Sequence, residues 1–316
     1  MNLWLDSGKP NLAEHLLVYR PYASVLLSPE FSSRNLRLLS RSDNARGAVN
    51  SLKRLHLQNI KFDWDSGAYR GLVDLRLHCF CSSTSISIAQ LVNILSSNPA
   101  LITLKLSCLK ITSSSDWSPT PVTLSCLQVL TLFYIDPKGL QFLLPLLILP
   151  GSSVKVGIGP TDLDSISSEL ERFFGRNSHV IALKLRQWKR SAFLTWLPFL
   201  TVLPRLDNLV LDSFHMDVGS DVGVGVDNPL LSVSPRLPSI LFSKCTITLE
   251  GLKMLVVEHG TSLLRLESCV VSDGSGINME DIQTSLLGAY PELQIVISNT
   301  SSAEHLEYCR MFNWTN

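Results

Sequence analysis

The sequence carries little charge and no excess of either sign. Only 17% of its 316 residues are charged, and 27 basic residues balance 27 acidic ones. A chain without net charge has no global attraction to nucleic acid or to an anionic membrane surface. We therefore expect neither nucleic acid nor a membrane as a partner. With 45% apolar residues, the same composition excludes a disordered chain and is sufficient for a large core.

Long apolar runs and a secretory leader are also missing. The most apolar stretch, GLQFLLPLLILP at 139–150, has about twelve residues, whereas a transmembrane helix needs roughly twenty. The first twenty residues lack the basic start and the apolar run of a signal peptide. The sequence therefore predicts a soluble protein of the cytoplasm or nucleus.

No disulfide framework is recognisable either. The seven cysteines are scattered, and their odd number among leucine-rich neighbours favours reduced thiols in the cytosol or nucleus. They are Cys79, Cys81, Cys108, Cys126, Cys245, Cys269 and Cys309. The segment HCFC at 78–81 resembles half of a zinc site, but no second pair follows at metal-ligand spacing, so we expect no metal.

Catalytic signatures are the last absence. The chain contains no G-x-S-x-G, H-E-x-x-H or G-x-x-x-x-G-K-[ST] motif, and its seven histidines are isolated. The glycines at 218–229 lack the G-x-G-x-x-G order of a nucleotide site, and we interpret them as a flexible insertion between repeats. We therefore expect no catalytic residue and no cofactor. An enzyme with an unrecognised site is the alternative.

What the sequence does contain is a repeat. Ten short segments place two apolar residues two positions apart, as Leu55 and Leu57 are in LKRLHLQN. The first members follow one another at steps of 20 to 31 residues. The pairs are Leu55/Leu57, Leu75/Leu77, Leu104/Leu106, Leu130/Leu132, Val156/Ile158, Leu183/Leu185, Leu209/Leu211, Ile240/Phe242, Leu264/Leu266 and Ile295/Ile297. This spacing, with L-x-x-L-x-L and a following Asn or Cys, is the signature of leucine-rich repeats.

The segments between these pairs follow a helical period. Apolar residues recur at Ile88, Leu91, Val92 and Leu95, which is the spacing of one helix face. Similar patterns occupy 136–150, 161–175, 248–260 and 278–291. One unit cannot bury both its strand and its helix face alone, so stacked units must share a core.

We therefore predict an α/β fold, a leucine-rich-repeat solenoid with a curved parallel sheet on its inner face and helices on its outer face. About ten units are expected over 36–300. The segment 1–35 is a candidate cap, and the tail at 301–316 is a candidate capping helix. The competing fold, a doubly wound open sheet, normally needs glycine-rich phosphate turns and has far fewer strands.

Several segments resemble the repeat region of fungal F-box-like leucine-rich repeat proteins. These are SLKRLHLQNIKFDWDSGAYRGLVDLRL, ISIAQLVNILSSNPALITLKL, LWLDSGKPNLAEHLLVYRP and PKGLQFLLPLLILPGS. In that family an N-terminal F-box binds the Skp adaptor of a cullin ubiquitin ligase, and the repeats hold the target. Here repeat-like sequence begins near residue 36, with one helix expected at 12–19. The F-box is therefore expected to be missing, and Skp and cullin are partners only if an upstream F-box exists.

The strand period of two predicts where a partner would bind. Residues beside the apolar pairs point to the opposite face of the sheet, which is the inner face of a solenoid. The candidate binding residues are Arg54, His56, Arg76, His78, Lys105, Lys184 and Arg186. Our hypothesis is that this basic stripe binds an acidic or phosphorylated protein segment, with bidentate pairing by arginine. The alternative is a solvated sheet face whose charges only keep the strands soluble.

The sequence thus predicts a non-enzymatic protein-interaction scaffold, resembling the target-binding repeats of an F-box ubiquitin-ligase receptor. A repeat-type regulator of a GTPase or of a cytoskeletal partner, without a ubiquitin link, is the second interpretation.

Overall fold

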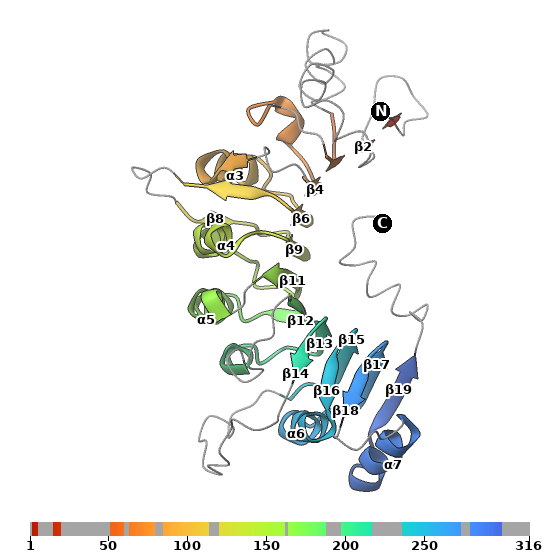
Figure 1. Ribbon diagram of the computed structural model, residues 1–316. Helices are drawn as coiled ribbons and strands as arrows, with labels where there is room; N and C mark the ends of the chain where they lie inside the picture. The colour runs from red at the N-terminus through yellow and green to blue at the C-terminus, as the bar shows by residue number, and fades with distance from the viewer. Residues whose placement is uncertain are drawn as a thin grey trace. The chain divides into compact units, whose positions relative to one another are not determined.

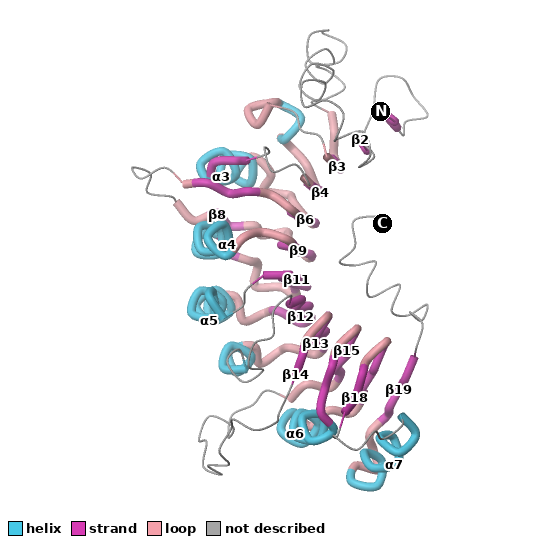
Figure 2. The backbone as a smooth tube through the Cα atoms, viewed as in Figure 1, coloured by secondary structure: helices cyan, strands magenta, loops and turns pink. Residues whose placement is uncertain are grey.

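The computed structural model consists of two compact units, Met1–Ser152 and Ser153–Asn316. The structure describes residues 2–5, 15–19, 51–59, 63–79, 85–113, 120–161, 164–187, 197–216, 236–272 and 279–298. In both units, strands alternate along the chain with helices or turns (Figure 2).

Within the described residues, the main sheet of the first unit has six strands that follow one another in chain order. They are β1 (Asn2–Leu5), β2 (His15–Tyr19), β3 (Arg54–Gln58), β4 (Asp74–His78), β6 (Thr103–Ser107) and β9 (Val129–Phe133). β1 and β2 are antiparallel, and every later pair is parallel. Consecutive parallel strands in chain order are what stacked repeats produce.

A second layer of short elements completes the first unit. It contains β5 (Ser85–Ser87), β7 (Lys110–Thr112), β8 (Val122–Thr123), β10 (Leu147–Ile148), η2 (Gly67–Tyr69), α3 (Ile88–Ser96), α4 (Pro137–Leu143) and η3 (Leu144–Leu146). Helix α3 begins at a capping box between Ser87 and Gln90. Helix α4 begins where the Asp136 side chain accepts from the Gly139 amide, with Pro137 in the first turn. Both helices lie on the same side of the main strands (Figure 1).

The second unit repeats this plan. Its main sheet is parallel and contains, among the described residues, β11 (Val154–Thr161), β12 (Val180–Gln187), β13 (Asn208–Asp212), β15 (Ser239–Ser243), β17 (Leu263–Glu267) and β19 (Gln294–Ser298). Its other elements are β14 (His215–Met216), β16 (Thr246–Thr248), β18 (Val270–Ser272), η4 (Asp164–Ile166), α5 (Ser167–Arg176), η6 (Leu197–Val202), α6 (Leu249–His259) and α7 (Met279–Ala289).

All ten predicted apolar pairs lie on main-sheet strands, and they align. Leu55 is paired with Leu75 and Leu75 with Leu104 in the first unit, and Leu183 is paired with Leu209 in the second. The first nine pairs are at most 1% exposed. The repeat prediction is confirmed, and the fold is an α/β leucine-rich-repeat solenoid.

A buried asparagine joins neighbouring repeats at the end of α3. Asn98 is 0% exposed, and its side-chain amide donates to the carbonyls of Tyr69 and Ile94 at 2.6 Å each. Its side-chain oxygen accepts from the Leu72 amide, also at 2.6 Å. These bonds satisfy three backbone groups. Without a partner, each buried group would lower the stability of the fold by roughly 1–3 kcal/mol.

Many main strands end in a left-handed turn. Among the described non-glycine residues, six have positive φ, and each directly follows a main strand. They are Asn59, Cys108, Tyr134, Ser213, Lys244 and Ser268. The turn aims the backbone N–H of this residue at the last carbonyl of the next strand: Ser213 donates to Ser243, and Lys244 donates to Glu267, both at 2.8 Å. This bond holds the repeats in register where the chain leaves the sheet.

The helix expected at 12–19 is wrong, because His15–Tyr19 forms strand β2, parallel to β3. Leu16 is buried and Leu17 is 41% exposed, which is the alternation of a strand rather than of a helix face. The expectations for 218–229, Cys81, Cys309 and 301–316 lie outside the described residues, and the boundaries at 35 and 300 stay predictions. Within the described parts of the chain, no helix is long and apolar enough to span a membrane.

The left-handed turn yields a prediction at Lys244, which is exposed and has φ of 55°. An L-residue there costs about 1–2 kcal/mol. Lys244→Gly should therefore raise the free energy of unfolding by up to about 1 kcal/mol, and Lys244→Val should lower it by about 1 kcal/mol. Urea denaturation measures both. In the control, Lys110→Gly on strand β7 should lower the free energy of unfolding. Stabilisation by glycine at both sites would contradict the left-handed conformation of residue 244.

Candidate binding face

The candidate site is the sheet face opposite the helices, which we call the inner face of each unit. Leu55 and Leu57 of β3 point into the core, so the strand alternation sends Arg54, His56 and Gln58 to the inner face. Because the strands are in register, equivalent inner-face side chains form rows across the sheet. The sequence therefore places charged residues of different repeats next to one another.

In the first unit, these side chains are organised around Asp74 on β4. Arg76 donates from Nε to Asp74 Oδ1 at 3.0 Å and from Nη2 to Oδ2 at 2.9 Å, a bidentate pair. His56 Nε2 on β3 lies 3.1 Å from Asp74 Oδ2. Burial raises the pKa of Asp74, but the hydrogen bonds and charges of His56 and Arg76 outweigh burial, so its pKa is lowered.

Two further basic side chains belong to this region. Lys105 on β6 is paired with Arg76 in the ladder and is only 2% exposed. Burial, together with the charge of Arg76, lowers the pKa of Lys105 to about 8. Burial alone lowers the pKa of His78, at the end of β4, to about 4. At neutral pH the histidine is therefore uncharged, and the charges of Arg76 and Lys105 face the single carboxylate of Asp74.

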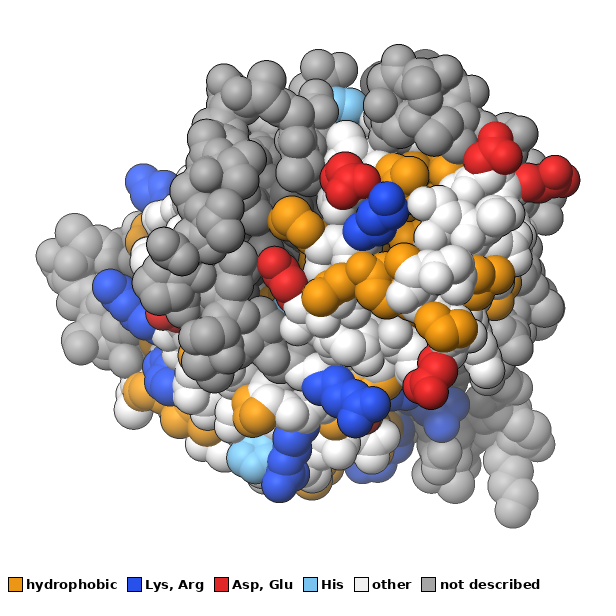
Figure 3. Space-filling view, turned by 90° about the horizontal axis from the view of Figure 1, so that it is seen from below, with side chains coloured by type: hydrophobic (Ala, Val, Ile, Leu, Met, Phe, Trp, Pro, Cys, Tyr) orange, Lys and Arg blue, Asp and Glu red, His pale blue; other side chains and the backbone are white. Residues whose placement is uncertain are grey.

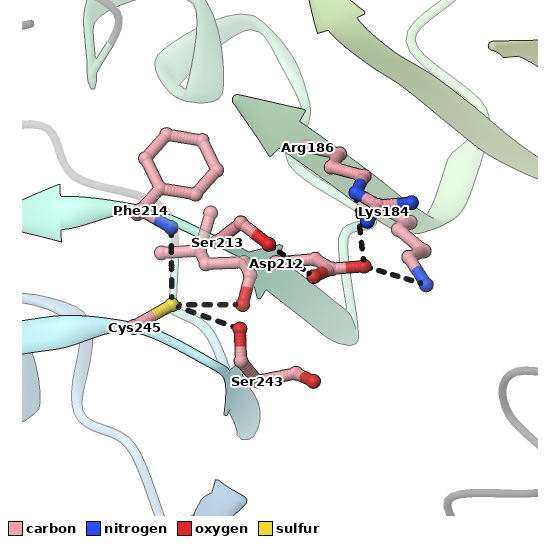
Figure 4. Close-up of polar contacts among 8 residues, drawn as sticks. Lys184, Arg186, Asp212, Ser213, Phe214, Ser243 and Cys245 are labelled. Carbon is pink, nitrogen blue, oxygen red and sulfur yellow. Dashed lines mark hydrogen bonds and ion pairs between the residues drawn. The ribbon is translucent and has the colours of Figure 1, made fainter. Parts of the chain in front are cut away.

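In the second unit, Asp212 at the end of β13 takes the same central role (Figure 4). Its Oδ2 lies 3.3 Å from Lys184 Nζ and 3.7 Å from Arg186 Nε, both on β12. Its Oδ1 accepts a hydrogen bond from the Ser213 hydroxyl at 2.9 Å. Here, too, two cations share one carboxylate.

The structure places all seven predicted residues on inner-face strands, but most of them are shielded from solvent. Arg54 is exposed, and His56 and Arg186 are half-buried. Four are at most 9% exposed, namely Arg76, His78, Lys105 and Lys184. Side chains of neighbouring strands cover these groups, and Arg76 and Lys184 are held by ion pairs with Asp74 and Asp212.

The strand period predicts that Asp74 and Asp212 lie on this face, but it does not by itself predict that each forms ion pairs with the basic residues. The signal was present: Asp-x-Arg on one strand puts Asp74 and Arg76 on the same face. The strand register also pairs Arg186 with Asp212. A search for acids opposite the basic stripe would have found both centres.

The described residues contain no group of three or more His, Cys, Asp or Glu side chains that could hold a metal ion. In the segment HCFC, the Cys79 side chain is buried in the core. Charged side chains of both signs lie among apolar ones on the face of the molecule seen in Figure 3.

Comparisons with known proteins add little beyond this geometry. No family model matches the chain, and a search of curated proteins finds no match either. Among solved structures, the chain is similar to an internalin (inlF) from Listeria monocytogenes, with 16% identity and a TM-score of 0.36 over 82% of this chain and 70% of that one. Because both values are low, the fold assignment rests on the strand register, and the F-box-like resemblance stays a prediction.

The Asp212 cluster predicts a specific loss of stability. Asp212→Asn removes the carboxylate from Lys184, which is 4% exposed, and should lower the free energy of unfolding by about 3 kcal/mol. Adding Lys184→Met should recover part of that loss, because the buried charge is then gone. Chemical denaturation measures both variants. The matched control is Asp207→Asn on an exposed side chain just before β13, with an expected change within about 0.5 kcal/mol; equal losses at 207 and 212 would contradict the role of Asp212.

Proposed function

We propose that this protein is a protein-interaction scaffold that binds its partner with the inner faces of its repeat units. The observation that carries the proposal is the in-register stacking of inner-face side chains from successive strands. Such a surface is extended and has few internal degrees of freedom, because every strand is fixed by its neighbours. We propose the cytoplasm or nucleus as its location, because the odd number of cysteines favours reduced thiols.

An acidic or phosphorylated protein segment is the partner that the charges favour. Around Asp74, Arg76 and Lys105 supply two cations, and around Asp212, Lys184 and Arg186 do the same. Each cluster therefore has at least one positive charge more than its carboxylate neutralises. Such a surplus attracts an anionic partner and disfavours a cationic one.

The accessible arginines make the direct contacts in this proposal. Arg54 is exposed, and the Arg186 side chain is 28% exposed. Each can present a planar guanidinium to a carboxylate or phosphate. The buried Lys105 and Lys184 contribute their charge without touching the partner. Charge reversal at the buried lysines would test folding more than binding, so the exposed arginines are the better variants.

Binding to acidic peptides tests the proposal. We expect the full chain to prefer glutamate-rich or phosphoserine peptides over the same peptides with glutamine or serine, measured by fluorescence anisotropy. Arg54→Glu or Arg186→Glu should weaken the affinity for the preferred peptides at least about tenfold, because a hydrogen bond to a charged group contributes roughly 1.5–3 kcal/mol. Affinity should also fall as salt is added.

The matched controls reverse a charge on the helical side. Lys138→Glu on α4 and Arg172→Glu on α5 change exposed cations of the first and second unit. Both controls should bind like the wild type. Equal binding of acidic and neutral peptides would contradict the proposal. Equal losses of affinity in the arginine variants and in the controls would show that the inner faces do not bind the peptides.

A ubiquitin-ligase connection is a finer proposal that rests on the family resemblance of the repeats. If the chain is the target-binding part of an F-box receptor, Skp and a cullin should co-purify with the full-length protein from its own cells. A scaffold that binds acidic peptides but brings down neither subunit would be a free-standing regulator, for instance of a GTPase or of a cytoskeletal protein.

A further inference from the structure

Two cysteines of the second unit lie opposite each other in adjacent repeats. Cys245 follows β15 by one residue of turn, and Cys269 follows β17 in the same way. The ladder pairs Ser243 with Glu267 before them and Thr246 with Val270 after them. Both pairings have the same offset in sequence as the two cysteines, so Cys245 and Cys269 are direct cross-strand neighbours.

The backbone fixes this juxtaposition from both sides. The Lys244 amide donates to the Glu267 carbonyl, and the Val270 amide donates to the Cys245 carbonyl, both at 2.8 Å. Neighbouring strands are about 4.8 Å apart, and disulfides need Cα atoms roughly 4.4–6.8 Å apart. The spacing expected for this register therefore lies within the range that a disulfide requires.

The two thiols differ in access and in environment. Cys245 is 1% exposed, whereas Cys269 is half-buried between the exposed residues Ser268 and Val270. A hydrogen bond with the Cys245 thiol lowers the pKa of Cys269. Burial, together with the same contact, raises the pKa of Cys245. Cys269 is therefore the accessible nucleophile, and Cys245 is the partner held beside it.

We propose that Cys245 and Cys269 form a reversible disulfide when the protein meets a peroxide. The Cys269 thiolate attacks the O–O bond of hydrogen peroxide, takes one oxygen as a sulfenic acid and, with a proton, releases the other as water. The Cys245 sulfur then attacks the Cys269 sulfur, and the sulfenic oxygen leaves as a second water with the Cys245 proton. Two thiols and one peroxide give one disulfide and two waters.

This bond would change the turn that carries Asp212. In the reduced protein, Cys245 Sγ lies 3.2 Å from the Leu211 carbonyl oxygen and accepts from the Phe214 amide at 3.4 Å (Figure 4). A disulfide removes the thiol proton and draws the sulfur toward Cys269. The contacts at both ends of the 211–214 turn are then weakened, next to the Asp212 carboxylate. The disulfide itself does not depend on the proposed function.

Peptide mapping of the oxidised full chain tests the proposal. The reduced protein is treated with hydrogen peroxide, the remaining thiols are alkylated, and the digest is analysed by mass spectrometry. We expect a peptide pair joined through Cys245 and Cys269 that dithiothreitol separates. Cys126→Ser, at an exposed cysteine of the first unit, should leave the pair unchanged. Cys245→Ser should abolish it and leave Cys269 as an over-oxidised acid.

If Cys245→Ser fails to fold, the peptide map of the oxidised wild-type protein is sufficient to test for the disulfide. Recovery of Cys245 as an alkylated thiol after peroxide treatment would overturn the proposal. So would Cys269 joined to any other cysteine, or found as sulfinic acid while Cys245 stays reduced.

Discussion

The structure depends on the register between adjacent parallel strands. Within each unit, the apolar pairs of successive repeats are aligned side by side, and at several repeats the amide that follows the strand is hydrogen-bonded to the last carbonyl of the next strand. The register decides which residues reach the core and which reach the inner face, because a shift by one position would exchange the two faces. It also brings Asp212 beside Arg186 and Cys245 beside Cys269. The candidate binding face and the proposed disulfide are thus consequences of the same alignment.

Burial of charge gives the inner face its second property. A charge removed from water is tolerated only with partners, and Asp74 and Asp212 provide them for the cations around them. The aspartates hold the basic side chains in fixed positions and reduce the net charge without cancelling it. Recognition of an anionic partner would therefore rely on positioned groups instead of on a strong general field, which agrees with the neutral composition of the whole chain.

Much of the fold could be predicted from the sequence, because the repeat multiplies a weak local signal. A single pair such as Leu104 and Leu106 is uninformative, whereas ten pairs at a steady spacing define strands, core and stacking together. The segment 12–19 was misassigned because a short apolar run fits a helix or a strand equally well, and only pairing with β3 decides between them. The burial of Lys105 and Lys184 could not be predicted, since it depends on neighbours from other repeats. Their aspartate neighbours, by contrast, can be predicted by aligning the strands in register.

The left-handed residue after the strand has a consequence for how this chain can vary in length. Strand, turn and inter-repeat bond occupy fixed positions relative to one another, as Ser213 and Lys244 illustrate, while the distance between successive repeats ranges from 20 to 31 residues. Length differences therefore fall in the sequence between one turn and the next main strand. A deletion of one residue between a strand and its turn would break the alignment of every neighbour in contact with it. Removal of an entire repeat would leave two flanking repeats whose strands can pair with each other. Growth and shrinkage of such a molecule proceed by whole modules.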